Sequence, residues 1–418
     1  TKIKRVVQHT RTTVSQKKRP FNFNATNFLG SLMPSKPSLS EQYILDAART
    51  STGLQDWGSD SFLEGMHMLL ESSLNEARLH HFGRKFLQKG CIRAVKDRLR
   101  LEKVVKDNPD ILNTPIEKPV FILGLPRTGT TLLQNLFFQD DRFRHLHYWE
   151  QVAIGPQPAP DNLKDNYIID SCNTFISRLK KIAPEFFIAH DIQPRGPEEC
   201  NGLMERDFSS IIYIMLRNIP TYTEWFQKRD MTSTYEYHRY QLQYLGYHFK
   251  GKRWVLKAPV HLLFLKYLFK VYPDAQILQL HRDPLKAIPS MSSLVVISRG
   301  IHSDHVNEIE TAEQLLKLMS HNINQSIAYR EAQVSGQILD ISFSELVKDT
   351  ITTVNKIYNW LGVDFTPETE TSMSRWLGGS KLKQEGEPHQ YSLEQFGLNE
   401  TRIKDCFAQY YERYTDYL

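Results

Sequence analysis

The hydrophobic pattern of the first quarter of the chain predicts helices. Residues 40–112 read as helical, and Ser40 followed by Glu41 is typical of a capped helix start. The Asn-Pro-Asp sequence at 108–110 indicates a turn after this helical region. Within residues 60–101 the apolar side chains recur at three- and four-residue spacing, as an amphipathic helix requires: Leu63, Met66, Met68, Leu69, Leu70 and Leu74.

Beyond residue 116 the pattern changes to short, nearly continuous apolar runs. The first run, PVFIL at 119–123, ends at a glycine and predicts a strand buried on both faces. Further runs are separated by helical patterns at 260–271, 309–333 and 346–361, and they lie at 254–256, 275–280 and 337–343. Strands that alternate with helices predict an α/β fold with a central parallel sheet and helices on both faces.

These patterns suggest one large domain preceded by a basic arm. We assign the arm to 1–40 and the domain to 41–418, with a helical lead-in at 41–115 and an α/β core at 116–418. An aromatic-rich helical insertion interrupts the core at about 140–250. The arm carries eight Lys and Arg residues and no acidic residue. It is either a targeting or surface-binding segment or, as we favour, a solvated arm lying on its own domain.

Composition narrows the function classes. The net charge of the 418 residues is only +5, which does not favour bulk binding of nucleic acid. No run of about 18 apolar residues occurs, so we expect no membrane span. The pairs His302/His305 and His145/His147 lack the neighbours of a metal site. We therefore expect a protein without a metal site and with a small-molecule partner. The few, widely spaced cysteines suit reduced thiols and a cytoplasmic location: Cys91, Cys172, Cys200 and Cys406.

The strongest chemical signal is the loop GLPRTGTT at 124–131, which lies between the first predicted strand and a helix beginning near Leu132. Such a strand–loop–helix unit directs backbone N–H groups at an anion. The spacing matches GxxxxGK[ST], except that Thr130 replaces the lysine that neutralises the β- and γ-phosphates in kinases. Because that lysine is absent and Arg127 lies within the loop, a diphosphate-like group fits better than a triphosphate.

The segment PRTGTT at 126–131 resembles the 5′-phosphosulfate loop of sulfotransferases that use 3′-phosphoadenosine-5′-phosphosulfate (PAPS), especially their bacterial-type branch. Arg282 follows the strand at 275–280, and the serine eight residues later completes a pattern that resembles the family's 3′-phosphate site. A separate 3′-phosphate requires such a second clamp. The resemblance implies the P-loop-like sulfotransferase fold, PAPS as donor, and donor contacts from Arg127, Thr128, Gly129, Thr130, Thr131, Arg282, Ser290 and Phe343.

Two positions depart from the family pattern. Leu132 occupies the place where the small-molecule branch often carries a tryptophan that stacks on adenine. Phe343 occupies the place of a tyrosine in many relatives, which keeps the ring and loses the hydroxyl. The adenine contacts are therefore not defined by the resemblance.

Sulfuryl transfer requires a base for the acceptor proton and cations for the sulfuryl oxygens. Lys257 and His261 follow the second predicted strand and resemble the family's Lys–His segment at the acceptor oxygen; an ordinary histidine pKa near 6.5 suits a base. Lys257 and Arg127 would then stabilise charge. Glu198 and Glu199, which we expect to open a helix near residue 200, are the competing bases, since tyrosylprotein sulfotransferases use a glutamate; ordinary helix capping is equally compatible.

The acceptor, a hydroxyl or an amine, is not identified by the sequence. Trp149 and Glu150 are candidates for lining its pocket or for a structural role, and Lys383, His389 and Tyr391 are candidates for a lid over the nucleotide. A small-molecule kinase and a non-catalytic adenine-nucleotide-binding protein are the alternative functions.

Overall fold

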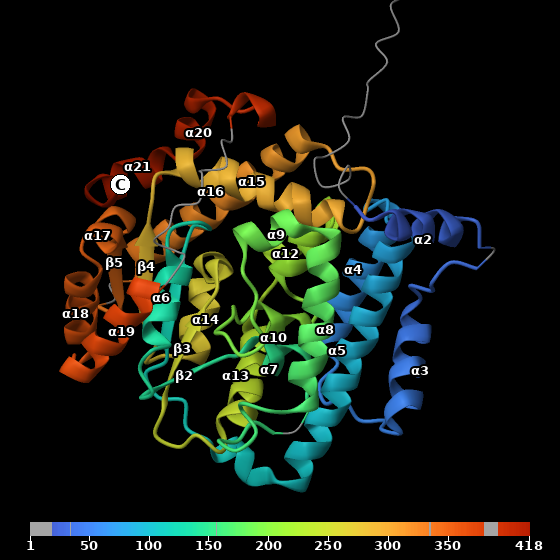
Figure 1. Ribbon diagram of the computed structural model, residues 1–418, viewed down its shortest axis with the longest axis horizontal. Coiled ribbons are helices and arrows are strands. Elements are labelled where there is room, and N and C mark those ends of the chain that lie inside the picture. Colours follow the sequence, from blue (N-terminus) through green and yellow to red (C-terminus); the bar gives the residue numbers. More distant parts are fainter. Residues whose placement is uncertain (1–18, 34, 156, 334–335, 380–391) are drawn as a thin grey trace, which may run out of the picture.

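The central sheet consists of five parallel strands in the order β2-β3-β1-β4-β5 (Figure 1). The computed structural model describes residues 19–33, 35–155, 157–333, 336–379 and 392–418. The strands are β1 (Val120–Gly124), β2 (Phe143–His145), β3 (Arg253–Lys257), β4 (Gln276–His281) and β5 (Ile338–Ser342). The predicted parallel sheet is thus confirmed, and the four predicted runs correspond to β1, β3, β4 and β5.

Helices cover both faces of the sheet, as predicted. Along β1, Phe121 and Leu123 belong to one hydrophobic core, and Val120 and Ile122 belong to the other. The second core is closed by α6 (Thr130–Phe137), α17 (Phe343–Lys348), α18 (Thr350–Leu361) and α19 (Pro367–Gly379). The first core extends into α14 (Leu265–Val271), α15 (Pro284–Gly300) and α16 (Glu308–Ala332). Burial on both sides explains why the strands read as continuous apolar runs.

The helical lead-in consists of α3 (Glu41–Thr52), α4 (Phe62–Asn75), α5 (His81–Asp107) and η1 (Pro109–Asn113). The amphipathic pattern at 60–101 therefore spans two helices, because the chain turns between Glu76 and His80. This turn is fixed by His80, whose backbone N–H bonds the His302 carbonyl and whose Nδ1 accepts from the Gly83 N–H at 3.0 Å. Ser40 precedes α3, but its side chain makes no capping bond.

The described part of the predicted arm packs on the domain. Helix α2 (Phe21–Ser31) lies against α5, where Asn27 Oδ1 accepts from the Phe82 N–H at 2.8 Å. The Arg19 guanidinium is buried and pairs with Asp304 at 2.6 Å. Residues 19–31 thus lie on the domain, and residues 1–18 lie outside the described residues.

The insertion contains one strand that the sequence did not reveal. The three residues of β2 pair with the first half of β3 at the sheet edge, and no apolar run marks them because Arg144 and His145 are two of the three. The remaining insertion is helical, as expected: α7 (Tyr148–Val152), α8 (Tyr167–Ile182), α9 (Pro184–Ala189), α10 (Asn201–Glu205), α11 (Ile211–Leu216), α12 (Pro220–Lys228) and α13 (Thr232–Gly246).

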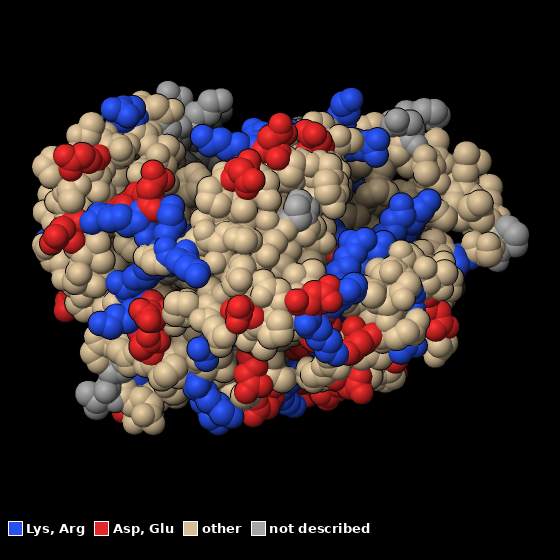
Figure 2. Space-filling model, turned by 90° about the horizontal axis from the view of Figure 1, so that it is seen from below, with Lys and Arg blue, Asp and Glu red and all other residues tan. Residues whose placement is uncertain are grey.

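Several predicted helices are interrupted in the structure. The region 260–271 divides into η2 (Pro259–Phe264) and α14, and the region 346–361 divides at Asp349, which caps α18. The chain ends with η3 (Glu394–Phe396), α20 (Glu400–Cys406), α21 (Ala408–Tyr414) and η4 (Thr415–Tyr417). Basic and acidic side chains are intermingled on the face that Figure 2 shows. None of the described helices has both the length and the apolar character that crossing a bilayer requires.

Candidate active site

The predicted site residues lie at the carboxyl ends of neighbouring strands. The loop 125–129 follows β1, Lys257 ends β3, Arg282 follows β4, and Phe343 follows β5. Since all strands are parallel and β1 lies between β3 and β4, these ends meet at one edge of the sheet. The sheet topology therefore brings together segments that are more than 200 residues apart.

The loop after β1 has the backbone of an anion-binding turn. Gly129 has φ +88° and immediately precedes α6, whose N-terminus faces the loop. Arg127 also has a positive φ, of 69°. The Thr128 hydroxyl donates to the Leu125 carbonyl at 2.7 Å and Thr128 is fully buried, so this side chain holds the loop in shape. Thr130 and Thr131 line the adjoining cavity.

The two predicted nucleotide anchors contact one another. Arg282 Nη1 donates to the Arg127 carbonyl at 2.8 Å, and Arg127 Nε donates to Ser290 Oγ on α15 at 3.2 Å. The Arg282 guanidinium carbon lies 4.2 Å from the centre of the Phe343 ring. A Cβ at Gly129 would lie 2.8 Å from Cδ2 of Phe343, so only glycine permits this close approach. The loop, the distant arginine and the aromatic ring thus form one contiguous unit.

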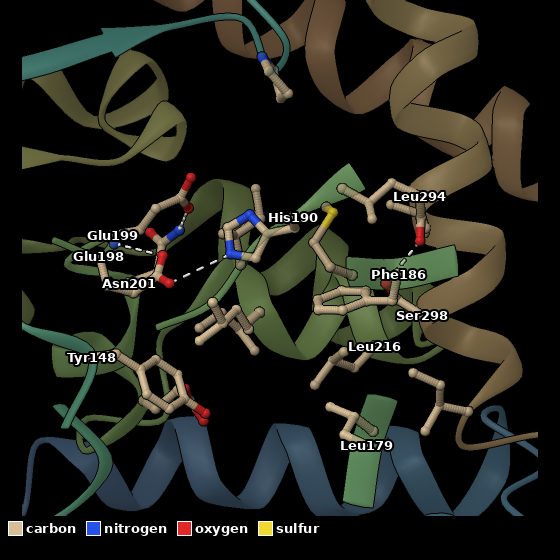
Figure 3. Close-up of a pocket in the computed structure, with 18 of the residues that line it drawn as sticks. Tyr148, Leu179, Phe186, His190, Glu198, Glu199, Asn201, Leu216, Leu294 and Ser298 are labelled. Atoms are coloured by element: carbon tan, nitrogen blue, oxygen red, sulfur yellow. Dashed lines mark hydrogen bonds and ion pairs between the residues drawn. The ribbon is translucent and has the colours of Figure 1, made fainter. Parts of the chain in front are cut away.

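The two adjacent carboxylates of Glu198 and Glu199 lie on the segment just before α10, not within that helix. Figure 3 shows both side chains with their neighbours His190 and Asn201. Lys257 Nζ is 2.7 Å from Glu199 Oε1, and Asn201 Nδ2 donates to Glu199 Oε2 at 2.7 Å. Glu198 Oε2 is 3.5 Å from His190 Nε2. The segment is fixed to the sheet because the Cys200 N–H donates to the Lys257 carbonyl at 3.0 Å.

The Glu198–His190 pair changes the acidity of both groups. Burial alone would raise the pKa of the Glu198 carboxyl, but His190 and Lys257 hold that pKa below its usual range. Burial likewise disfavours charged His190, yet Glu198 and Glu199 raise the pKa of His190 above its usual value. His190 was missed by the sequence reasoning, since no motif surrounds it and only the fold brings it to Glu198.

The structure places His261, the first predicted base, in the core and away from the residues that line the cavity. Its side chain is fully buried in η2, where Nδ1 lies 2.6 Å from the Tyr235 hydroxyl and Nε2 lies 3.1 Å from Cys200 Sγ. Burial, together with His238, holds the pKa of His261 well below its usual value. Both ring nitrogens are engaged within the core and the ring does not line the cavity, so His261 is a structural residue.

One continuous cavity of about 1390 Å³ joins the loop to the helical insertion. At one end it is lined by Arg127, Gly129, Arg282 and Phe343, and beyond Glu198 and Glu199 its walls are mainly apolar, among them Leu179, Phe186, Leu216 and Leu294 (Figure 3). This volume exceeds the range of about 300–1,000 Å³ of a typical small-ligand pocket. The cavity is therefore large enough to hold two ligands end to end.

The acceptor side differs in detail from the sequence-based expectation. Trp149 and Glu150 are buried and do not line the cavity; the Glu150 carboxylate accepts from the His147 N–H at 2.9 Å and pairs with Arg144. The neighbouring Tyr148 lines the cavity instead. The candidate lid residues Lys383, His389 and Tyr391 lie outside the described residues. Within the described part of the chain, no group of three or more His, Cys, Asp or Glu side chains could hold a metal ion.

A parallel α/β sheet with a glycine-containing anion loop after its central strand defines a P-loop-like nucleotide-binding fold. The family model described as "Sulfotransferase family" matches residues 119–367. The chain therefore belongs to the sulfotransferase family, and the resemblance drawn from residues 126–131 and Arg282 is confirmed.

Mycobacterial proteins are among the similar chains. The omega-hydroxy-beta-dihydromenaquinone-9 sulfotransferase Stf3 of Mycobacterium tuberculosis (strain CDC 1551 / Oshkosh) is 23% identical over 258 residues, which are 59% of this chain and 63% of Stf3. The match thus spans less than two thirds of that curated relative. The crystal structure of sulfotransferase STF1 from Mycobacterium tuberculosis H37Rv covers 90% of this chain and 100% of its own, with 28% identity and a TM-score of 0.78. Sulfotransferase STF9 from Mycobacterium avium covers 91% and 98%, with 26% identity and a TM-score of 0.80.

Proposed function

We propose that this protein transfers a sulfuryl group from PAPS to a hydroxyl group of an apolar small molecule. The observation that carries the proposal is the contact between the lysine-free loop and the second arginine, with Arg282 Nη1 2.8 Å from the Arg127 carbonyl. A nucleotide with phosphates at both its 5′ and 3′ positions needs two anionic subsites that are joined in this way. The cavity that continues from these residues provides the room for an acceptor.

The residues at the strand ends fit the donor chemically. The N-terminus of α6 and the hydroxyls of Thr130 and Thr131 suit the 5′ end, while Arg282 and Ser290 suit the 3′-phosphate. Apolar side chains that line the same end of the cavity offer a slot for adenine in place of the missing tryptophan: Leu132, Phe343, Val347 and Leu377. When bound, PAPS supplies an activated sulfuryl group.

Glu199 is the base that the geometry favours. Its carboxylate lines the cavity, and Lys257 at the end of β3 holds one of its oxygens next to the loop. Glu198 is less suitable because its carboxylate is already engaged with His190, with Oε2 3.5 Å from Nε2, and this partner helps to hold the pKa of Glu198 below its usual range. Glu199 would take the proton of the acceptor hydroxyl while that oxygen bonds to sulfur, and Arg127 and the α6 N-terminus would stabilise the charge left on the donor phosphate.

The acceptor class follows from the cavity and from one relative. The walls beyond Glu199 are mostly apolar, with Phe175, Leu179 and Leu216 among them. Stf3, by its name, acts on a hydroxylated menaquinone, which is an apolar molecule with a hydroxyl group. We therefore propose that the acceptor of this protein is an elongated apolar molecule that bears a hydroxyl group.

Titration calorimetry with 3′,5′-ADP, the donor product, tests the donor site. We expect micromolar binding that Arg282→Ala weakens at least tenfold, since a charged hydrogen bond contributes about 1.5–3 kcal/mol. Transfer of labelled sulfate from PAPS to a panel of long-chain alcohols then tests catalysis. Tighter binding of ATP than of 3′,5′-ADP would refute the assignment, and 3′,5′-ADP binding without transfer to any alcohol would refute the enzymatic part alone.

A further inference from the structure

The apolar cavity contains a group of charged side chains that the donor site does not use. Arg93 on α5, Glu205 at the end of α10 and Arg217 after α11 all line it. Neither the Arg93 guanidinium nor the Glu205 carboxylate forms a hydrogen bond or ion pair with any residue that the structure describes. These three residues form the group that we call the inner charged cluster.

Arg217 makes the cluster unusual, because it is only 3% exposed. Its Nε and Nη1 atoms are buried and find no hydrogen-bond partner within the described part of the protein. A buried donor that lacks a partner costs roughly 1–3 kcal/mol, more when it is charged, so such groups normally have a ligand or water. The cluster thus has the character of a binding site rather than of a packed core.

The charges of the cluster favour an anion. Arg93 and Glu205 are close enough for their charges to interact, and Arg217 adds a second positive charge against the single carboxylate. Burial raises the pKa of Glu205 above its usual value, although the surrounding arginines oppose this shift. Any protonation of Glu205 increases the excess of positive charge in the cluster.

The cluster lies close to the proposed catalytic carboxylates. The Tyr148 side chain is near enough to feel the charges of Arg93 and Glu205 as well as that of Glu198. Asn201 and Glu205 lie one helical turn apart on α10 and both line the cavity, and Asn201 Nδ2 bonds Glu199. One molecule can therefore approach Glu199 and the inner charged cluster at the same time.

We propose that the acceptor bears a carboxylate in addition to its hydroxyl, and that Arg93 and Arg217 bind this carboxylate while the hydroxyl lies at Glu199. This inference rests on the proposed sulfuryl transfer, because it specifies the substrate class of the same cavity. An apolar hydroxy acid would fit the mainly apolar walls with its body, and its carboxylate would balance the positive charge that Glu205 alone leaves uncompensated in the cluster. The negative charge of Glu205 would disfavour an acceptor that carries a second carboxylate.

Binding of ω-hydroxydodecanoic acid and of its methyl ester, which differ in the carboxylate alone, tests the proposal. Calorimetry at pH 7 with saturating 3′,5′-ADP measures both affinities without requiring turnover. We expect the acid to bind at least tenfold more tightly than the ester, as for a charged hydrogen bond. Arg93→Gln should reduce this ratio to about threefold or less, and Arg93→Lys, which keeps the charge, should preserve most of it.

Two further variants separate binding from folding. Glu205→Gln should increase the acid-to-ester ratio, the opposite sign from Arg93→Gln, which general destabilisation would not produce. Arg100→Gln alters an arginine on the same helix that does not line the large cavity, and it should leave the ratio unchanged.

The proposal would be overturned if the acid and the ester bound with equal affinity or if neither bound. It would also be overturned if Arg93→Gln weakened the affinity for both compounds by the same factor. If the acid is preferred but neither compound is sulfated, the carboxylate site stands and the proposed transfer fails.

Discussion

Replacing Gly129 with alanine tests the packing of the anion loop. At φ +88° an alanine backbone is strained by about 1–2 kcal/mol. The new Cβ would also lie 2.8 Å from Cδ2 of Phe343, and overpacking of this kind costs about 1–3 kcal/mol. We therefore expect Gly129→Ala to lower the free energy of unfolding by about 2–5 kcal/mol, of which about 1–3 kcal/mol comes from the ring.

A matched glycine isolates the two contributions. Gly251 has φ +78°, and a Cβ there would meet no heavy atom within 4 Å. Gly251→Ala should therefore lose only the backbone part, about 1–2 kcal/mol. In a Phe343→Ala background the ring is absent, so Gly129→Ala should there cost about as much as Gly251→Ala does in the wild type.

Urea unfolding of the four variants and the wild type measures these differences. Calorimetry with 3′,5′-ADP on the same samples should show weaker binding for Gly129→Ala, because a displaced Phe343 no longer supports Arg282, and unchanged binding for Gly251→Ala. The reasoning fails if Gly129→Ala and Gly251→Ala cost the same, or if removing the Phe343 ring leaves the cost of Gly129→Ala unaltered.

Three further predictions concern proton-carrying side chains. Glu199→Gln should lower kcat by about a hundredfold or more with 3′,5′-ADP affinity retained, whereas Glu198→Gln should lower it less than tenfold; the reverse order would transfer the base to Glu198. His261→Ala should lower the free energy of unfolding by about 2–4 kcal/mol, because it opens a cavity and leaves Tyr235 unpaired, yet the pH–rate profile of the folded enzyme should not change. Loss of the low-pH limb of that profile, which reports the deprotonation of a base, would restore His261 as the base. In an NMR titration His190 should have a pKa above 6.5, and Glu198→Gln should lower that pKa. Because the folded pKa exceeds the unfolded one, the stabilisation from His190 is complete below pH 6.5 and is lost as pH rises through the folded pKa. An unchanged titration midpoint of His190 in Glu198→Gln would contradict the pairing.

The sheet and the donor loop were predictable because their signals are local. Four strands appear as apolar runs, since β1, β3 and β4 are buried almost throughout and β5 is at least partly buried, and the loop at 124–131 shows its glycines at fixed spacing between a strand and a helix. Arg282 could be expected beside this loop because it follows β4, which is a recognisable strand and pairs with β1. In contrast, β2 has only three residues, and its Arg144 is buried through pairing with Glu150, which no local pattern reveals.

The acceptor side was less predictable because distant contacts define it. His261 follows β3 at a suitable spacing, but η2 directs its ring into the core toward Tyr235 on α13. His190 meets Glu198 only through the turn between α9 and α10, and Arg93 meets Glu205 only because α5 packs against the insertion. Sequence spacing indicates which residue types are present, whereas tertiary packing decides which of them share a cavity.

The large cavity has walls of two origins, with donor contacts from the strand ends and apolar walls largely from α5, α8 and α11. Substitutions on those three helices alter the acceptor compartment without touching the backbone that holds the nucleotide. Under the proposed function, new acceptors could therefore arise by substitution in these helical walls while the strand-end residues that would hold the donor stay unchanged.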